Sequence, residues 1–411
     1  MQEISERLVR EGHSVKVFTT DALDIELFWD PKKRRVEQQR ETHCGVEIER
    51  FPVLHLPAPQ ISFRGTRWLM TRLSALPLDT TSLLAQMSRL APRVPALLRA
   101  LEELDGPLDV VHGMNICFEA LLWPAYWAAR RMGAAFIITP LTHLGEDDDN
   151  RVRKYYTMRH QLALIAASDA VLVQTELERA YLARRGVPEE RMVKAGVGVN
   201  PAAVVGGDER RFRDKYGIEG PIVFYIGTTA YDKGTFHLVE AMGRLWERGC
   251  EASLVLAGPT MDQFTAFLQA QPPAVRRRTK VLGFIPEADK KDLLAAGSIM
   301  AMPSCTDSLG IVYLEAWLYA KPVIGARAGG VPEVIDDGED GLLVRFGDVE
   351  GLAASLARLL SDASLAARLG SRGREKVLSR YTWDHIYPVV REVYERVCRE
   401  RRRAPRSVRS T

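Results

Sequence analysis

Two carboxylates, Asp307 and Glu315, stand eight positions apart in one stretch of the chain. Glu315 falls in an otherwise apolar segment with a helical pattern, and a buried carboxylate needs a partner because an unpaired buried charge is costly. Ser308, Leu309 and Gly310 precede that segment, where a helix start offers backbone N–H groups and the positive end of the helix dipole. The pattern predicts an anion-binding site at the helix start, between the two acids. It suits a ligand with a phosphate in its middle and hydroxylated rings on both sides.

A second candidate anion site follows the apolar run 222–226, where Gly227, Thr228 and Lys233 form a glycine turn with a nearby lysine. The alternative is a structural turn whose lysine points into water. The presence of two such candidates in one half of the chain favours phosphate binding. Gly329 and Gly330 mark a further turn that is equally compatible with a structural role and with a ligand loop.

His112 and His143 each end a predicted strand in the first half of the chain. A single histidine is more often structural, but two at strand ends are candidates for contact with an acceptor or for proton handling. The acidic run 146–150 has no second ligand cluster, so we interpret it as a solvated loop and expect no metal. Motifs of the commonest hydrolases, metalloproteases and P-loop NTPases are absent from the sequence.

Composition sets the class of protein. With 411 residues the chain is expected to form two domains, and a net charge of +3 is too small to indicate a nucleic-acid partner. The five cysteines are scattered and include no CxxC pair, which favours a reducing cytoplasm and argues against disulfides or zinc. No apolar run reaches membrane-spanning length.

Short β-branched runs alternate with helical patterns along the whole chain, which predicts an α/β fold of two doubly wound, Rossmann-like domains facing across a cleft. The expected strands are 14–20, 46–53, 109–113, 134–140, 170–175, 192–198, 222–228, 252–258, 279–285, 298–304, 322–328 and 341–346. Expected helices include 237–248, 289–296 and 349–369. We expect an N-terminal domain over 1–204, a C-terminal domain over 205–381, a crossover helix over about 382–400 that returns to the first domain, and a basic disordered tail over 401–411.

Two segments of the first half are unusual. Residues 1–13 read as a helix followed at once by a strand, so the N-terminal domain is expected to lack its first strand and glycine turn. We therefore hypothesise that the native protein has residues upstream of Met1. Residues 61–76 interleave arginines with apolar side chains. We favour a helix that packs on its own domain, with an interfacial membrane helix as the alternative, so peripheral contact with the inner face of the membrane stays open.

The segment from Asp307 to Ala316, continuing through Pro322 and Gly329–Ile335, resembles the paired-acid signature of retaining glycosyltransferases of family 4, also called glycosyl transferases group 1. The likeness is strong over about 220–345 and looser in the first half. It implies the GT-B fold and transfer of a hexose-type unit from a nucleotide-diphosphate sugar to an acceptor, without a metal or other cofactor.

The resemblance also implies residue roles. Glu315 would hold the ribose hydroxyls of the donor, Asp307 would contact the transferred sugar, and Lys233 would neutralise the diphosphate. The implied donor-binding positions are Gly227, Thr228, Gly283, Phe284, Ser308, Leu309 and Gly310. His112 or His143 would lie near the acceptor. The family's paired acids bind and orient rather than forming a glycosyl-enzyme.

Two positions depart from the family pattern. Asp307 stands where glutamate is usual, and Thr228 stands where a phosphate-binding arginine is expected, so full activity is in question. The alternatives are a weak or inactive nucleotide-sugar-binding subunit, an epimerase on the same fold, and a phosphorylase, for which no lysine that would anchor pyridoxal phosphate is found. The sequence does not specify the sugar, the base or the acceptor.

Overall fold

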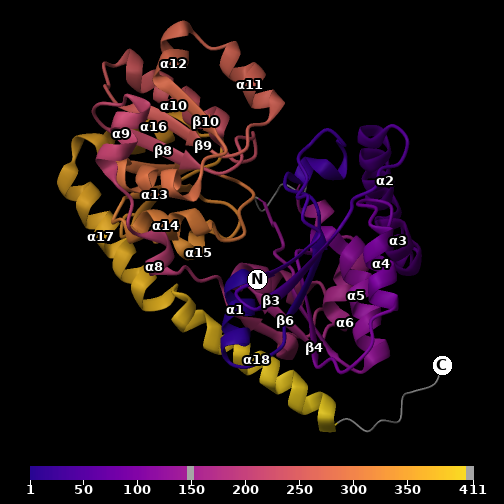
Figure 1. Ribbon diagram of the computed structural model, residues 1–411. Coiled ribbons are helices and arrows are strands. Elements are labelled where there is room, and N and C mark those ends of the chain that lie inside the picture. The colour runs from indigo at the N-terminus through magenta and orange to yellow at the C-terminus, as the bar shows by residue number, and fades with distance from the viewer. Residues whose placement is uncertain (146–151, 404–411) are drawn as a thin grey trace. The chain divides into compact units, whose positions relative to one another are not determined.

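The computed structural model describes residues 1–145 and 152–403 of the chain (Figure 1). The chain forms two compact units. Unit 1 comprises residues 1–142, 153–195 and the described residues from Tyr387 onward. Unit 2 comprises residues 196–386 together with the described residues of 143–152. The sequence placed the domain boundary at 204/205, whereas the compact units divide at 195/196.

Unit 2 contains a sheet of six parallel strands in the order β10-β9-β8-β11-β12-β13. The strands are β8 (Ile222–Ile226), β9 (Ser253–Ala257), β10 (Thr279–Gly283), β11 (Ile299–Met302), β12 (Val323–Ala326) and β13 (Gly341–Val344). Counted from the first strand of the unit, this order is 3-2-1-4-5-6, the doubly wound arrangement of dinucleotide-binding folds. The chain reverses direction across the sheet between β8 and β11. That switch point is where such sheets bind ligands.

The helices of unit 2 precede, connect and follow these strands (Figure 1). They are α8 (Pro201–Val204), α9 (Glu209–Tyr216), α10 (Thr235–Glu247), α11 (Asp262–Gln269), α12 (Pro273–Arg278), α13 (Glu287–Ala296), α14 (Ile311–Leu318), α15 (Val331–Val334), α16 (Val349–Ser361) and α17 (Ala363–Arg380). Helix α10 packs against α16, and α14 packs against α17. Strand β8 is buried from Ile222 to Tyr225 because helices cover the sheet on both faces.

Unit 1 contains two sheets. The strands are β1 (Lys16–Thr20), β2 (Arg40–His43), β3 (Val46–Phe51), β4 (Val110–Met114), β5 (Ala135–Thr139), β6 (Ala170–Val173) and β7 (Met192–Lys194). The first sheet has the order β1-β3-β2, and the second is parallel with the order β4-β5-β6-β7. Every residue of β5 is buried, so this strand is the centre of the unit's core.

The helices of unit 1 lie mostly before β4 or between the strands of the parallel sheet. They are α1 (Gln2–Arg10), α2 (Pro59–Ser74), α3 (Thr81–Ser88), α4 (Pro95–Glu102), α5 (Glu119–Met132), α6 (Arg159–Ala167) and α7 (Glu176–Arg184). Short 3-10 segments are η1 (Ile25–Phe28), η2 (Ile116–Phe118), η3 (Arg153–Tyr155) and η4 (Glu189–Arg191). Helix α18 (Trp383–Arg403) starts in unit 2 and continues in unit 1 from Tyr387.

Every strand expected from the sequence is present. Three details of secondary structure differ, the last being that residues 401–403, expected in a disordered tail, belong to a helix. Strand β2 was missed because its sequence is polar and it lies at the edge of its sheet, where one side of the strand meets water. The helix expected over 349–369 is two helices, because Asp362 ends α16 and caps α17 by accepting a hydrogen bond from the Leu365 N–H at 2.8 Å. Helix α18 includes Arg401, Arg402 and Arg403, and residues 404–411 lie outside the described part of the chain.

Among residues 1–145 and 152–403, no helix combines the length and the apolar composition that crossing a bilayer requires.

Candidate functional site

The switch point of the unit 2 sheet brings together two of the predicted site residues. Lys233 lies in the loop after β8, and Asp307 lies in the loop after the neighbouring strand β11. The Lys233 ammonium nitrogen is 3.2 Å from Asp307 Oδ1, and each side chain is about one-fifth exposed. The structure therefore places a cation and a carboxylate in contact where a doubly wound sheet binds its ligand.

The residue before Lys233 joins the two loops. The backbone carbonyl of Asp232 accepts from the Cys305 N–H at 2.9 Å, and its carboxylate accepts from the Thr306 hydroxyl at 2.9 Å. Gly234 has φ of 75°, and a Cβ there would lie 2.2 Å from the Pro303 carbonyl oxygen. Only glycine fits so close an approach at this φ, so the backbone around Lys233 is fixed against the end of β11.

Helix α14 begins directly after Gly310, which has φ of 85°, and carries Glu315 in its second turn. Leu309, just before this helix, is buried. Glu315 is 7% exposed, and its Oε1 accepts a hydrogen bond from the Lys290 ammonium at 2.7 Å. Burial raises the pKa of Glu315 above its ordinary value, although Lys290 acts in the opposite direction.

Each of the two acids keeps one buried oxygen without a partner among the described residues: Oδ2 of Asp307 and Oε2 of Glu315. Buried carboxylate oxygens are normally hydrogen-bonded, and each unsatisfied one needs an explanation. Both residues lie at the carboxyl edge of one sheet. In each of them the other carboxylate oxygen is paired with a lysine: Lys233 with Asp307 and Lys290 with Glu315. The arrangement is suited to two further donors, such as the hydroxyl groups of a ligand.

Glycines line the same edge of the sheet next to β8. The Gly227 N–H donates to the Ala257 carbonyl at 2.8 Å, and the Gly258 N–H donates to the Gly283 carbonyl at 2.7 Å. Phe284 follows β10 and is 68% exposed, an unusual exposure for a phenylalanine. The Thr228 carbonyl accepts from the Tyr225 hydroxyl at 2.7 Å, which fixes the turn but gives the threonine side chain no phosphate-binding charge.

His143 belongs to unit 2 and lies within electrostatic reach of the same groups. Burial and the nearby Lys233 lower its pKa to about 4, against the opposing effect of Asp307 and Asp232. The following segment is held at the site because the Gly145 carbonyl accepts from the Gly329 N–H at 3.1 Å. The structure therefore groups His143, Lys233 and Asp307.

His112 has different surroundings, in unit 1. Its Nδ1 is 2.6 Å from the Tyr394 hydroxyl of α18, and its Nε2 is 2.8 Å from the Thr139 hydroxyl at the end of β5. Burial lowers the pKa of His112 to about 3, so the imidazole is neutral near pH 7. Both ring nitrogens are engaged in joining α18 to the parallel sheet.

The sequence did not identify Lys290 or Asp232 as parts of this site. Lys290 is 25 positions from Glu315 on a separate helix, so no spacing pattern connects them. The predicted acidic loop 146–150 lies outside the described residues. Within the described part of the chain, the cluster of possible metal ligands is Glu6, His43 and Cys44, in unit 1, and it includes none of the predicted site residues.

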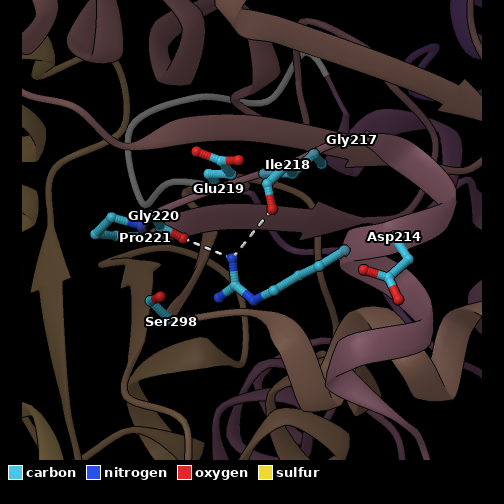
Figure 2. A pocket seen from close by; sticks show the side chains of 8 residues that line it. Asp214, Gly217, Ile218, Glu219, Gly220, Pro221 and Ser298 are labelled. Atoms are coloured by element: carbon cyan, nitrogen blue, oxygen red, sulfur yellow. Dashed lines mark hydrogen bonds between the residues drawn. The ribbon is translucent and has the colours of Figure 1, made fainter.

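An open pocket of unit 2 lies away from the predicted site residues, and its arginine has a structural role (Figure 2). It lies where β8 and β11 begin, and it is lined by Arg213, Asp214, Gly217, Ile218, Glu219, Gly220, Pro221 and Ser298. Its arginine donates to the Gly220 carbonyl at 2.7 Å and to the Ala296 carbonyl at 3.2 Å. Through these hydrogen bonds Arg213 stabilises the loop before β8.

Comparisons with known proteins match both halves of the chain. A family described as glycosyl transferases group 1 matches residues 208–376, and a glycosyl transferase 4-like domain matches residues 1–198. Alpha-maltose-1-phosphate synthase of Mycolicibacterium smegmatis is 33% identical over 187 residues, or 43% of this chain and 48% of that protein. Alpha-D-kanosaminyltransferase of Streptomyces kanamyceticus is 27% identical over 288 residues, or 67% of this chain and 66% of that protein. The chain thus matches between about half and two-thirds of the length of these curated relatives.

Solved structures show the same fold. Sucrose-phosphate synthase from Thermosynechococcus elongatus has a TM-score of 0.71 at 20% identity, with 97% of this chain and 92% of that chain covered. Anabaena HepE in complex with UDP-glucose has a TM-score of 0.62 at 18% identity, with 81% of this chain and 95% of that chain covered. These similarities establish the two-domain GT-B fold.

Proposed function

We propose that this chain, which belongs to the glycosyl transferases group 1 family, transfers a sugar from a nucleotide-diphosphate sugar to an acceptor with retention of configuration. One observation carries the proposal. At the switch point of the unit 2 sheet, Asp307 and Glu315 each pair with a lysine through one oxygen and leave the other buried without a partner among the described residues. A ligand with hydroxyl groups on both sides of a diphosphate supplies the missing donors.

In this proposal Glu315 binds the ribose of the donor. Its free Oε2 accepts from one ribose hydroxyl, and Lys290 keeps the neighbouring oxygen charged and oriented. A charge-assisted hydrogen bond of this kind contributes roughly 1.5–3 kcal/mol. Phe284, exposed after β10, provides an aromatic face for the base.

Lys233 and the start of α14 bind the diphosphate. When the sugar leaves, negative charge grows on the outer phosphate, and a nearby ammonium and a helix N-terminus stabilise that charge. Because Thr228 supplies no positive charge, Lys233 carries more of this role. We propose that these groups act without a metal ion or other cofactor.

Asp307 contacts the transferred sugar through Oδ2, the oxygen that Lys233 does not engage. The lysine contact keeps Asp307 occupied as an ion pair, which suits an orienting group better than a nucleophile. Retention is therefore proposed from the family relationship and not from a glycosyl-enzyme on Asp307.

His143, grouped with Lys233 and Asp307, is the better of the two histidine candidates for the acceptor side. Its lowered pKa leaves it neutral near pH 7, so a ring nitrogen can accept a hydrogen bond from an acceptor hydroxyl. We propose the cytoplasm as the place of action, because the five cysteines are scattered along the chain and include no CxxC pair, a usage typical of a reducing compartment.

A thermal-shift screen tests the proposal with the full chain. Uridine, guanosine and adenosine diphosphates and their sugars are the probes, with UDP and UDP-glucose first because HepE is seen with both. A ligand that binds the native state raises Tm by linkage. We expect at least one nucleotide-diphosphate sugar to raise Tm and Glu315→Ala to weaken its binding by at least about 1.5 kcal/mol.

Glu350→Ala is the matched control, since Glu350 is an exposed acid of the same unit paired with Arg244. Unchanged donor affinity in Glu315→Ala would remove Glu315 from the site. Nucleotide release that requires an acceptor, with the anomeric configuration kept in the NMR spectrum of the product, supports transfer. Turnover without nucleotide release would indicate an epimerase. Donor binding without turnover over a broad acceptor panel would indicate an inactive binding subunit.

A further inference from the structure

Helix α2 has two apolar faces, only one of which is buried. Met70 is fully buried with Leu84 and Met158 in a small core of unit 1. On the other face Ile61 is 76% exposed, Trp68 is 55% exposed and Leu69 is 42% exposed. The sequence favoured an ordinary amphipathic helix that packs on its own domain, and the buried face fits that interpretation. The exposed face is left unexplained by it.

The exposed surface continues beyond the helix. Helices α2 and α3 pack against each other, and the loop that joins them exposes further leucines. We call this surface the α2–α3 patch and define it by Ile61, Trp68, Leu69, Leu76, Leu78 and Leu83. Single exposed apolar side chains are ordinary on a protein surface, but six of them on two packed helices and the loop between them indicate a binding surface.

The patch stands on a rigid base. Arg67, on the inner face of α2, forms a buried ion pair with Glu119 and donates to the Tyr155 carbonyl at 3.1 Å. Burial alone would raise the pKa of Glu119, but the Arg67 guanidinium and His160 hold it below its ordinary value. The α2–α3 loop is held as well, because Arg159 donates to the Leu76 carbonyl at 2.8 Å. The leucines and Trp68 are therefore presented by ordered backbone.

All charged residues of helix α2 are arginines, and the exposed acid Asp79 lies in the α2–α3 loop. From residue 52 to residue 78 the chain contains no aspartate or glutamate. Arg64 and Arg72 are exposed, and at 100° per residue they fall within about 80° of Ile61 and Trp68 on the helix circumference. The Arg72 guanidinium lies 5.4 Å from the centre of the Trp68 ring.

This combination identifies the occupant. Tryptophan prefers the boundary between lipid headgroups and acyl chains, and arginine keeps its charge at the phosphates while its stem lies along apolar surface. A second copy of the chain, related by a two-fold axis, would place the arginine-bearing face of α2, a helix without acids, against its own counterpart. Helix α2 is 16 residues long and carries three arginines, which suits an interfacial helix.

We propose that the α2–α3 patch docks the protein on an anionic lipid surface, with Ile61 and Trp68 at the acyl boundary and Arg64 and Arg72 at the lipid phosphates. This inference goes beyond the proposed sugar transfer and does not rest on it. The sequence suggested an interfacial helix over 61–76 as an alternative, and the α2–α3 patch extends that surface to α3.

Sedimentation of the full chain with vesicles tests the proposal. One vesicle is phosphatidylcholine alone, and the other is phosphatidylcholine with about one-third phosphatidylglycerol. We expect binding to the anionic vesicles that weakens with salt, and little binding to the neutral ones. The paired change Arg64→Glu and Arg72→Glu, and separately Ile61→Ser with Trp68→Ser, should each reduce the partition coefficient roughly tenfold or more.

Two controls match these changes. Arg276→Glu with Arg277→Glu alters the same charge on exposed residues of α12, and Leu378→Ser removes an exposed leucine of α17. Both should bind vesicles like the wild type. Equal binding to neutral and anionic vesicles, or patch variants that bind like the wild type, would overturn the proposal. Loss of a dimer in the patch variants, with no vesicle binding by the wild type, would assign the surface to a second copy of the chain.

Discussion

At the scale of single residues, the centre of the account is the buried acid Glu315 with Lys290 on one oxygen and no described partner on the other. Glu315 thus has one carboxylate oxygen paired with a lysine and one available to a ligand, and both features are needed for donor binding. A fully paired acid would leave no acceptor for a ribose, and an unpaired acid in this environment would be protonated. Lys290 stabilises the charged form of Glu315 before the donor binds.

Donor binding should therefore depend on pH through Glu315. Burial raises its pKa, so as pH falls the carboxylate is lost at a higher pH than for an exposed glutamate. We expect the affinity for a nucleotide-diphosphate sugar to decrease as pH drops towards 5, and Glu315→Gln to give a weaker but flatter profile. Isothermal titration calorimetry at several pH values measures this affinity. The nucleotide-diphosphate sugar is a suitable ligand because its phosphates do not titrate in this range. A profile with the same slope in wild type and variant would exclude Glu315 as the titrating group.

Lys233 should distinguish ligands by their phosphates. Lys233→Met removes the ammonium that faces the outer phosphate, so we expect at least tenfold weaker binding of a nucleoside diphosphate and little change for the nucleoside monophosphate. Calorimetry with the two nucleotides measures the difference. Equal losses for both would mean that Lys233 acts on the fold and not on the diphosphate.

The sequence identified the chemistry of this site better than its contacts. Asp307, Glu315 and Lys233 were proposed from residue type and spacing, and the structure places Lys233 against Asp307. Lys290 was missed because a contact between two helices leaves no local pattern. His112 was proposed for the acceptor side because it ends a strand, but a strand end does not reveal that Tyr394 and Thr139 occupy its ring nitrogens.

At the scale of elements, the loop after β8 depends on Gly234. A Cβ at this position meets the Pro303 carbonyl at 2.2 Å, and φ of 75° adds backbone strain. We expect Gly234→Ala to destabilise unit 2 by about 1–3 kcal/mol and to weaken nucleotide binding by displacing Lys233. Gly249→Ala, with φ of 86° and open space around its Cβ, is the matched control. It should lower stability without changing affinity; loss of affinity in both would contradict the local explanation.

Helix α18 should be sensitive to acid through His112. The pKa of His112 is about 3 in the folded protein and about 6.5 in the unfolded chain, so the unfolded chain binds more protons below pH 6.5. The stability from neutral His112 is therefore complete above pH 6.5 and is lost as pH falls towards 3. We expect the free energy of unfolding to fall by roughly 1.4 kcal/mol per pH unit over much of that window.

Urea unfolding at pH 7 and pH 5 measures this effect. His112→Gln should flatten the dependence, and His13→Gln, a change of an exposed histidine, should leave it as in the wild type. If His112→Gln does not fold, the histidine pKa in the wild type can be followed by NMR. A value near 6 for His112 would contradict the account.

The elements themselves were predictable to different degrees. Buried parallel strands such as β5 and β8 are apolar throughout, so composition alone marks them. The polar edge strand β2 has no such signal because its pairing comes from β3. The break at Asp362 was missed because a helical hydrophobic pattern runs on both sides of it, and only the capping bond reveals the turn.

At the scale of the whole molecule, the strand order of unit 2 links fold and function. The alternation of strands and helices predicts a parallel sheet, but it does not specify the order β10-β9-β8-β11-β12-β13. That order places the ends of β8 and β11 side by side and so joins two segments that are over 70 residues apart in sequence. Both candidate anion sites found in the sequence thus become one site.

A crystal structure of the protein with a bound nucleoside diphosphate would show whether the two acids and Lys233 form the donor site. We expect a ribose hydroxyl within hydrogen-bonding distance of Glu315 Oε2 and the outer phosphate beside the Lys233 ammonium and the start of α14. A nucleotide bound in another place, such as the pocket beside Arg213, with both acids untouched, would contradict this expectation.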